Sequence, residues 1–221
     1  PSHFKVKEYC PLVFRAFREY WKVHDSSFRV GEISIIVVFF FHCDVCFSVI
    51  SKDSLTEPPV PLNETAKSNI TYYLSSDRRF VLKCISKEDV EQIHNILPEY
   101  HRYIVKLSDT LLPHYYALYR LTVDDKENYI LVMRNIFSSR LKIHYKYDVK
   151  VKTKKNKNNG KGKLEGVSLG STVDRNASDK EKLNPCPTLK DNDFIEDKRT
   201  IDLGPEQKQI FLDRLKRDVN V

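Results

Sequence analysis

The chain has 221 residues, enough for one well-packed core or two small lobes. Its composition, 41% hydrophobic and 30% charged, is that of ordinary globular proteins and excludes wholesale disorder or a fibrous repeat. A net charge of +7 favours acidic partners such as nucleotides, nucleic acid or anionic membranes, and five scattered cysteines argue against a disulfide framework and for a reducing compartment.

Apolar spacing predicts helices and strands in alternation along the chain. The predicted elements are a helix over 11–24, strands over 70–76 and 79–85, a helix over 87–97, strands over 115–123, 129–135 and 141–148, and a helix from Pro205. Pro11 suits a first helical turn, Ser86 is a predicted N-cap, and Pro98 is expected to end the second helix. Polar turns join the strands, namely Ser-Asp-Arg in the first pair and DDKEN in the second. This order predicts an α+β fold with an antiparallel sheet and flanking helices.

Two segments do not fit this pattern. Residues 30–50 form an apolar block between polar stretches, and residues 151–169 carry six lysines against one glutamate in a low-complexity run. The longest apolar run, 33–41, is too short to span a bilayer, which takes roughly 18 apolar residues. The first ten residues lack the apolar region of a signal peptide, so we expect neither a signal nor a membrane span, and we interpret three glycosylation sequons as chance.

Two motifs in these segments allow a functional interpretation. Cys43 and Cys46 with His42 could form half a zinc site, but the sequence offers no second ligand pair, so no metal is predicted. The lysine-rich run at 152–163 could bind nucleic-acid phosphates, but it has no aromatic residues to stack on bases. We therefore expect a solvated loop there and no nucleic-acid partner.

Lys83 lies inside the apolar strand FVLKCI, where an unpaired ammonium is costly to bury. Kinases use a strand lysine of this kind to hold the ATP phosphates and pair it with an acid on the next helix. Glu88, Asp89 and Glu91 are the acids on that predicted helix. The simpler alternative is a lysine whose head reaches solvent. The preceding stretch, ETAKSNITYYLSSD, has no glycine for a phosphate-covering loop, and Asn69 is its one residue that readily tolerates positive φ.

Several long, collinear motifs carry a family resemblance. They are PSHFKVKEYCPLVFR, DRRFVLKCISKEDVEQIHNIL, YHRYIV, TLLPHYYALYRLTVD, RNIFSSRL, ASDKEK, PTLKDNDF and FLDRLKRDV. Together they resemble the phosphatidylinositol phosphate kinases, and among them type II, the phosphatidylinositol 5-phosphate 4-kinases. The resemblance covers nearly all of the chain outside 30–50 and 151–169. It implies the N-terminal lobe and the start of the C-terminal lobe of that kinase fold, with residues 1–221 forming a partial kinase domain.

The resemblance also suggests an origin for the two atypical segments. The family pattern K-Y-D-L-K-G-S-T-V is similar to K-Y-D-V-K at 146–150 followed by G-S-T-V at 170–173, so deleting 151–169 restores it. Both segments begin with Val, whose codons begin with GT as introns do. We hypothesise that both are retained introns or gene-model errors. Genuine insertions in exposed loops are the alternative, since folds tolerate them well.

The resemblance implies roles for individual residues. For ATP, Lys83 would hold the phosphates, Asn135 and Phe137 would lie at the hinge against the purine, and Asn69 would take a nucleotide-loop position. For the lipid, Lys150, Arg175 and Lys190 match basic positions that would meet the substrate phosphate. A phosphorylated head group needs several cations, so these residue types suit the role.

The sequence departs from the family pattern in three places. Ala66 and Asn69 stand where the family's nucleotide loop has glycines. Relatives place the glutamate that pairs with the lysine where Gln92 stands, and Glu91 lies one residue earlier, about 100° round the helix. The family's catalytic aspartate and its metal-binding aspartate would lie beyond Val221. We therefore expect no catalytic and no metal-binding residue in this chain, and no activity from the chain alone.

By resemblance, the parent enzyme would transfer the γ-phosphate of ATP, with Mg²⁺, to a phosphatidylinositol phosphate, at the 4-hydroxyl of phosphatidylinositol 5-phosphate. The implied partners are a phosphoinositide lipid, the anionic cytosolic membrane surface and a second copy of the chain, paired through the N-terminal lobe. The implied location is cytoplasmic and peripheral at membranes. The alternative function is a non-catalytic phosphoinositide-binding scaffold or pseudokinase.

Overall fold

A computed structural model describes two compact units of the chain. The described residues are 4–23, 28, 60–62, 71–75, 77–107, 109–137, 140–149, 186, 188–198 and 200–220. The first unit comprises Pro1–Arg140 and Pro205–Val221, and the second comprises Leu141–Gly204. The predicted insertions at 30–50 and 151–169, with Cys43, Cys46 and the three sequons, lie outside the described residues, so the hypotheses about them stay hypotheses.

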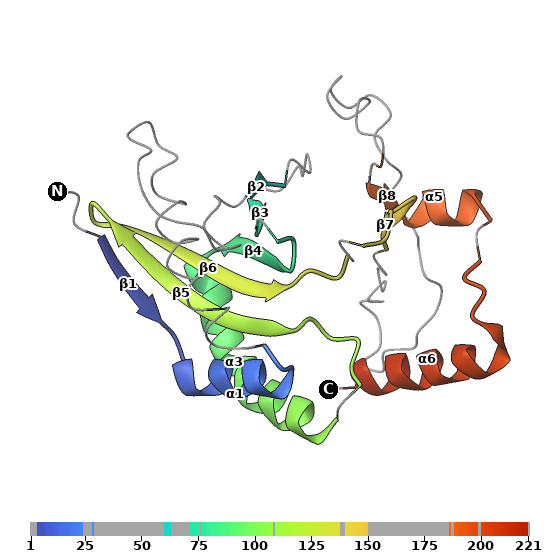
Figure 1. The fold of residues 1–221 in the computed structure, drawn as a ribbon, viewed down its shortest axis with the longest axis horizontal. Coiled ribbons are helices and arrows are strands. Elements are labelled where there is room, and N and C mark those ends of the chain that lie inside the picture. The colour runs from blue at the N-terminus through green and yellow to red at the C-terminus, as the bar shows by residue number, and fades with distance from the viewer. Residues whose placement is uncertain are drawn as a thin grey trace, which may run out of the picture. The chain divides into compact units, whose positions relative to one another are not determined.

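The first unit is built on a six-stranded sheet whose neighbouring strands all run antiparallel. The strand order is β1-β5-β6-β4-β3-β2 (Figure 1). The strands are β1 (Phe4–Glu8), β2 (Val60–Pro61), β3 (Tyr72–Leu74), β4 (Phe80–Ile85), β5 (Tyr115–Val123) and β6 (Lys126–Arg134). The predicted antiparallel α+β fold is thus confirmed.

Helices α1 (Pro11–Tyr20) and α3 (Lys87–Lys106) cover one face of this sheet (Figure 1). Phe14 and Phe17 of α1 are fully buried against Leu118 and Leu131 of the sheet. The predicted helix with Pro11 in its first turn is confirmed, although it ends at Tyr20 rather than at residue 24. Its apolar spacing of three and four residues therefore produces the packed face that the sequence predicts.

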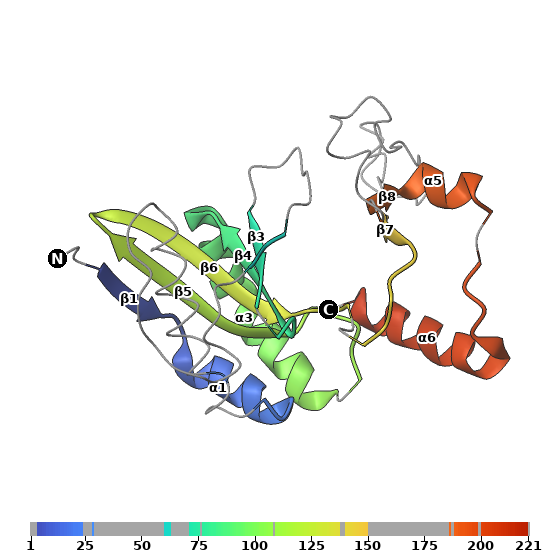
Figure 2. The same cartoon turned by 45° about the horizontal axis from the view of Figure 1, so that its top comes forward.

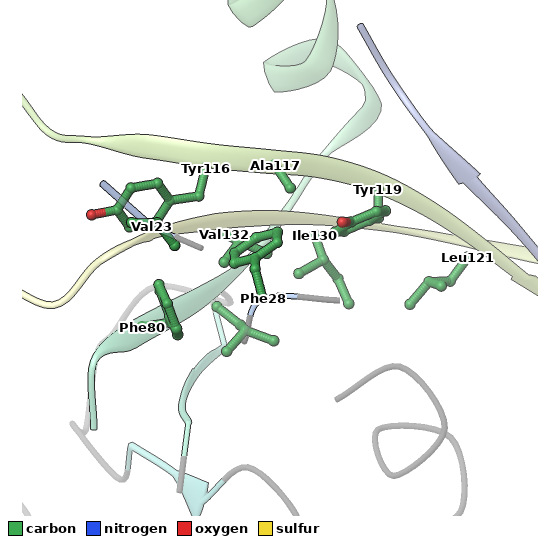
Figure 3. Packing of buried hydrophobic residues seen from close by; sticks show 10 residues of the cluster. Val23, Phe28, Phe80, Tyr116, Ala117, Tyr119, Leu121, Ile130 and Val132 are labelled. Atoms are coloured by element: carbon green, nitrogen blue, oxygen red, sulfur yellow. The ribbon is translucent and has the colours of Figure 1, made fainter. Parts of the chain in front are cut away.

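The other face of the sheet carries a second apolar cluster (Figure 3). Phe80 and Leu82 of β4 and Ile130 and Val132 of β6 lie in it together with Phe28. Successive strand residues point to opposite faces, so Leu82 and Lys83 face different sides of the sheet. Lys83 consequently lies on the side that α1 and α3 cover.

Helix α3 is longer than the sequence predicts. Ser86 caps it as expected: its hydroxyl accepts a hydrogen bond from the Asp89 N–H at 3.1 Å, and the Asp89 carboxylate accepts one from the Ser86 N–H. The expectation that Pro98 ends the helix is wrong, because α3 continues to Lys106. A proline inside a helix costs about 3 kcal/mol. Burial of Tyr100 and Ile104 after the proline offsets this cost.

The β5–β6 hairpin turns more tightly than the predicted DDKEN loop. Strand β6 begins at Lys126, so the turn consists of Asp124 and Asp125, with φ of 45° and 62°. Two-residue turns of this hand match the right-handed twist of the strands, and aspartate is one of the few residues that adopts them. Glu127, expected in the loop, pairs instead with Arg120 of β5 at 3.0 Å.

Strand β1 was not expected from the sequence. It pairs with β5 and forms one edge of the sheet. Its sequence FKVKE is short, and charged residues surround its one aliphatic side chain, so periodicity gives little signal. Lysines are typical of strands that lie at sheet edges.

Helix α6 (Gly204–Asp218) confirms the predicted helix near Pro205, and polar contacts join its C-terminal end to the segment that follows α3 in the same unit. Asp109 pairs with Arg214 and Arg217 at 2.8 Å each. The Asp218 carboxylate accepts hydrogen bonds from the Tyr103 hydroxyl and from the Leu111 N–H. The two arginines hold the pKa of Asp109 below its ordinary value, chiefly through the hydrogen bond from Arg214.

The second unit contains β7 (Lys146–Asp148), β8 (Thr188–Lys190) and α5 (Asp191–Glu196). Strands β7 and β8 pair in parallel, and α5 follows β8 directly (Figure 2). Of the predicted strand over 141–148, only the last three residues are strand. Its alternation of apolar residues was misleading, because β7 pairs with a partner about forty residues away and not with a neighbouring hairpin strand.

Candidate functional site

Lys83 stands in the middle of β4, between two neighbouring strands. It lies opposite Tyr72 of β3 and opposite Leu131 of β6. Directly opposed residues of antiparallel strands share a face of the sheet. Leu131 is buried beneath the helices, whereas Lys83 and Tyr72 are half-buried. Leu131 therefore gives the Lys83 stem a buried apolar neighbour on one side, and Tyr72 gives it a half-buried one on the other.

No acid of α3 is paired with Lys83. Glu91 and Gln92 are exposed, and the side of α3 that faces the sheet carries Val90 and Ile93. Asp89 is used in the cap of the helix. Among the residues that the structure describes, Lys83 forms no ion pair or hydrogen bond through its ammonium. The expected displacement of the acid from its family position stays a prediction.

Asn135 fixes the chain where it leaves β6. Its Nδ2 donates to the Arg78 carbonyl at 2.8 Å, and its Oδ1 accepts a hydrogen bond from the Phe137 N–H at 3.0 Å. Its own N–H donates to the Arg79 carbonyl at 2.9 Å. The side chain of Asn135 therefore holds the β3–β4 turn and the predicted hinge together, and Phe137 remains partly exposed.

The β3–β4 turn that Asn135 contacts is itself closed by side chains. Ser75 is buried, accepts a hydrogen bond from the Phe80 N–H at 3.0 Å and donates one to Asp77 at 2.6 Å. The same Asp77 carboxylate accepts the Arg79 N–H at 3.0 Å. These bonds satisfy the backbone of a turn that contains no glycine, with Arg78 in the left-handed region at φ 58°.

Lys190 is the described member of the three predicted lipid-phosphate residues. It ends β8, and its ammonium pairs with Asp148 of β7 at 2.8 Å. Its backbone N–H donates to the Asp193 carboxylate at 2.8 Å, which fixes the strand end where α5 begins. Both ends of Lys190 are thus held by carboxylates.

Three predicted site residues, Asn69, Lys150 and Arg175, lie outside the described residues, and their roles stay predictions. Sequence reasoning missed Asp148, although the K-Y-D motif contains it, because its partner Lys190 is 42 residues away. In the described part of the chain, no group of three or more acidic, histidine or cysteine side chains is arranged to hold a metal ion. No helix in that part is long and apolar enough to cross a bilayer.

Comparisons with known proteins connect this geometry to a family. A family model described as phosphatidylinositol-4-phosphate 5-kinase matches residues 54–221. The chain is similar to phosphatidylinositol 5-phosphate 4-kinase type-2 alpha of Mus musculus, with 42% identity over 99% of this chain and 44% of the relative. The type-2 alpha protein of Homo sapiens is 41% identical over the same shares. The type-2 beta protein of Homo sapiens is 40% identical over 99% of this chain and 43% of the relative.

The chain thus spans less than half the length of these curated relatives. The family match nevertheless includes β4 with Lys83, the exit from β6 with Asn135, and the β7–β8 pair with Lys190. It extends over well more than half of the chain, and the similarity to the relatives extends over almost all of it. The chain belongs to the phosphatidylinositol phosphate kinase family.

Proposed function

We propose that this chain is the nucleotide-binding part of a lipid kinase that transfers the γ-phosphate of ATP to a phosphatidylinositol phosphate. The carrying observation is Lys83, a half-buried lysine on a central strand within the matched family region. In the proposed reaction an inositol hydroxyl oxygen bonds to the γ-phosphorus and the bond to the β–γ bridging oxygen breaks, which leaves ADP. The names of the relatives support the 4-hydroxyl of phosphatidylinositol 5-phosphate as the acceptor.

In this proposal the nucleotide lies beside β4 and the exit from β6. Lys83 holds the phosphates, Phe137 borders the purine, and Asn135 fixes the backbone around it through Arg78. Asn69, which precedes β3 in the sequence, is proposed to take the nucleotide-loop position that the resemblance implies. Mg²⁺ would neutralise phosphate charge in the complete enzyme. Because the chain spans 44% of its relatives' length, we expect the 221-residue polypeptide to bind nucleotide without transferring phosphate.

The test for the nucleotide site is a titration of the purified chain with a fluorescent ATP analogue. Lys83→Ala removes one charge-assisted contact and should weaken binding by about tenfold or more. Lys87→Ala is the matched control, because Lys87 is an exposed lysine at the start of α3. Equal dissociation constants for the two variants would contradict the role of Lys83. Lipid phosphorylation by the purified chain would contradict the expected inactivity.

The lipid phosphate is proposed to meet Lys150, Arg175 and Lys190. The chain stays basic even without the two atypical segments 30–50 and 151–169, and this supports recruitment to the anionic cytosolic membrane surface, at about 1 kcal/mol per well-placed cation. The corresponding location is cytoplasmic and peripheral at membranes. Flotation with phosphatidylcholine vesicles containing phosphatidylinositol 5-phosphate tests this, and Lys190→Gln should reduce the bound fraction more than Lys208→Gln, which neutralises an exposed lysine of α6.

A homodimer through the first unit is also proposed. Strand β1 is an edge of the sheet, with Val6 42% exposed, and an edge strand can pair with a second copy through its free backbone groups. Sedimentation should show a dimer that Val6→Glu dissociates, since the substitution places two carboxylates close together at a two-fold interface. A Val6→Glu protein that still sediments as a dimer would exclude this edge.

One observation favours the second candidate, a non-catalytic phosphoinositide-binding scaffold or pseudokinase. Within the described residues, Lys83 has no acidic partner on α3, whereas active protein kinases have the corresponding ion pair in place. The two binding tests distinguish between these functions. Vesicle binding without measurable nucleotide binding would favour the scaffold, and binding of both ligands would favour the kinase.

A further inference from the structure

The pairing of β7 with β8 gathers charged side chains on one face of the second unit. The register places Lys146 opposite Thr188 and Asp148 opposite Lys190. Residues two apart in a strand share a face, so these four side chains lie on the same side of the strand pair. These four side chains include two cations and one carboxylate. Tyr147 points to the other side, where it packs on Phe194.

Asp148 is the carboxylate that pairs with the ammonium of the proposed phosphate ligand Lys190. The Lys190 ammonium and the Asp148 carboxylate are 2.8 Å apart, and their side chains are 32% and 39% exposed. An ammonium has three N–H donors, and this contact uses one of them. Among the described residues the ammonium makes no second hydrogen bond or ion pair, so its other two donors can serve a phosphate.

A phosphate bound at Lys190 therefore lies close to the negative charge of Asp148. The carboxylate orients the ammonium, but it also repels the phosphate, and this repulsion increases with the charge of the head group. An inositol head group with two added phosphates meets more repulsion than one with a single added phosphate. The carboxylate of Asp148 thus lowers the affinity for the lipid with two added phosphates more than the affinity for the lipid with one.

We propose that Asp148 is a specificity-determining residue that makes the Lys190 site discriminate against head groups carrying an additional phosphate. The inference deepens the proposed function and rests on the lipid-binding role given there to Lys190. The proposed reaction adds one phosphate to the substrate, so the product is the lipid that Asp148 repels more strongly. Asp148 would favour binding of the substrate and release of the product.

The experiment compares two lipids on the full 221-residue chain. Phosphatidylcholine vesicles contain either phosphatidylinositol 5-phosphate or phosphatidylinositol 4,5-bisphosphate, and binding is measured by flotation. Asp148→Asn removes the charge and keeps an oxygen that can accept from Lys190. We expect it to tighten binding to the monophosphate about twofold and binding to the bisphosphate about fivefold to tenfold, and so to shift the ratio of affinities.

Asp197→Asn is the matched control, because Asp197 is an exposed acid of the same unit that accepts a hydrogen bond from Tyr147 at 2.8 Å. It also removes one negative charge, but should leave the affinity ratio unchanged. Asp148→Glu keeps the charge and should retain the ratio of the parent. Asp148→Ser is a second neutral variant that is measured alongside Asp148→Asn, and circular dichroism checks the folding of both.

The outcomes separate this inference from the proposed function. If the ratio of the two lipid affinities is unchanged in both neutral Asp148 variants, the inference is overturned. It is also overturned if these variants bind both lipids more weakly and to the same extent, which would mark Asp148 as a purely structural residue. If Lys190→Gln reduces vesicle binding while the ratio is insensitive to Asp148, the proposed lipid site stands and the inference fails. If Lys190→Gln leaves binding to both lipids unchanged, the proposed role of Lys190 is wrong and the inference falls with it.

Discussion

The two units differ in what holds them together. In the first, apolar clusters cover both faces of a six-stranded sheet, and residues such as Phe17 and Leu82 are fully buried. In the second, Asp193 is the one buried side chain among those the structure describes, and polar contacts such as Lys190–Asp148 join its elements. The first unit therefore places Lys83 in a sheet with an apolar core on each face, whereas polar contacts at partly exposed side chains join the described elements of the second. Truncating a buried side chain in the first unit should therefore cost more stability than truncating an exposed one in the second.

The largest expected effect comes from opening a cavity in the first unit. Leu82→Ala removes a fully buried side chain at the centre of β4 and should lower the free energy of unfolding by about 2–5 kcal/mol. Ile195→Ala in α5 is the comparison, because Ile195 is 51% exposed and its truncation should cost less than about 0.5 kcal/mol. Urea denaturation followed by far-UV circular dichroism measures both. Similar costs for the two variants would contradict the contrast between the units.

Arg18 sharpens the contrast, because it is a buried polar residue within the apolar unit. It is 3% exposed, and its guanidinium donates to the Tyr116 carbonyl at 2.8 Å and lies 4.7 Å from the Phe28 ring. Arg18→Met leaves the carbonyl without this donor and should cost about 1–3 kcal/mol in the same denaturation experiment.

Arg15→Met is the control on the same helix. Arg15 pairs with Glu19 at 3.0 Å with more than half of each side chain exposed, and exposed pairs of this kind contribute under about 1 kcal/mol. If Arg15→Met were as destabilising as Arg18→Met, burial of the Arg18 guanidinium would not explain its cost.

Much of the first unit could be predicted from the sequence, and little of the second could. The cap at Ser86, the strand around Lys83 and the first helix follow from local periodicity, which the fold preserves. Pro98 was misinterpreted because burial further along α3 outweighs its local cost. Strand β8 and the Lys190–Asp148 pair depend on a register between distant segments, and no local pattern encodes such a register. The candidate site shows the same limit. The position of Lys83 on a strand was predictable, but the sequence only partly predicted that, among the described residues, no acid of α3 pairs with it.

His114 gives the first unit a pH dependence. Its ring stacks on Trp21, with the ring centroids 4.1 Å apart, and burial, helped by Arg134, lowers the pKa of His114 to about 4. The ordinary value is about 6.5, so between pH 6.5 and 4 the unfolded chain binds a proton that the folded chain does not. The contribution of His114 to the free energy of unfolding is therefore fully present above pH 6.5 and is lost as the pH falls towards 4.

We expect His114→Phe, which keeps an aromatic ring against Trp21, to reduce the loss of unfolding free energy between pH 7 and pH 5 by about 1 kcal/mol, a value discounted for partial exposure. Trp21 is the single tryptophan of the chain, so its fluorescence follows unfolding of the region that contains His114. If the unfolding free energy of the variant has the same pH dependence as that of the parent, His114 is not the residue that takes up a proton on unfolding.

The smallest expected effect lies in the second unit, at Tyr147. Its hydroxyl donates to Asp197 at 2.8 Å, and its ring packs edge-on against Phe194 with the ring centroids 5.1 Å apart. Tyr147→Phe removes the hydrogen bond and keeps the ring, so we expect a loss of about 0.5 kcal/mol, at the low end for a hydrogen bond because the contact is exposed. Amide hydrogen exchange in α5 should detect this loss as faster local opening, while the denaturation midpoint followed by Trp21 changes little. A shift of that midpoint as large as the one from Leu82→Ala would mean that the polar contacts of the second unit contribute as much stability as the apolar core of the first.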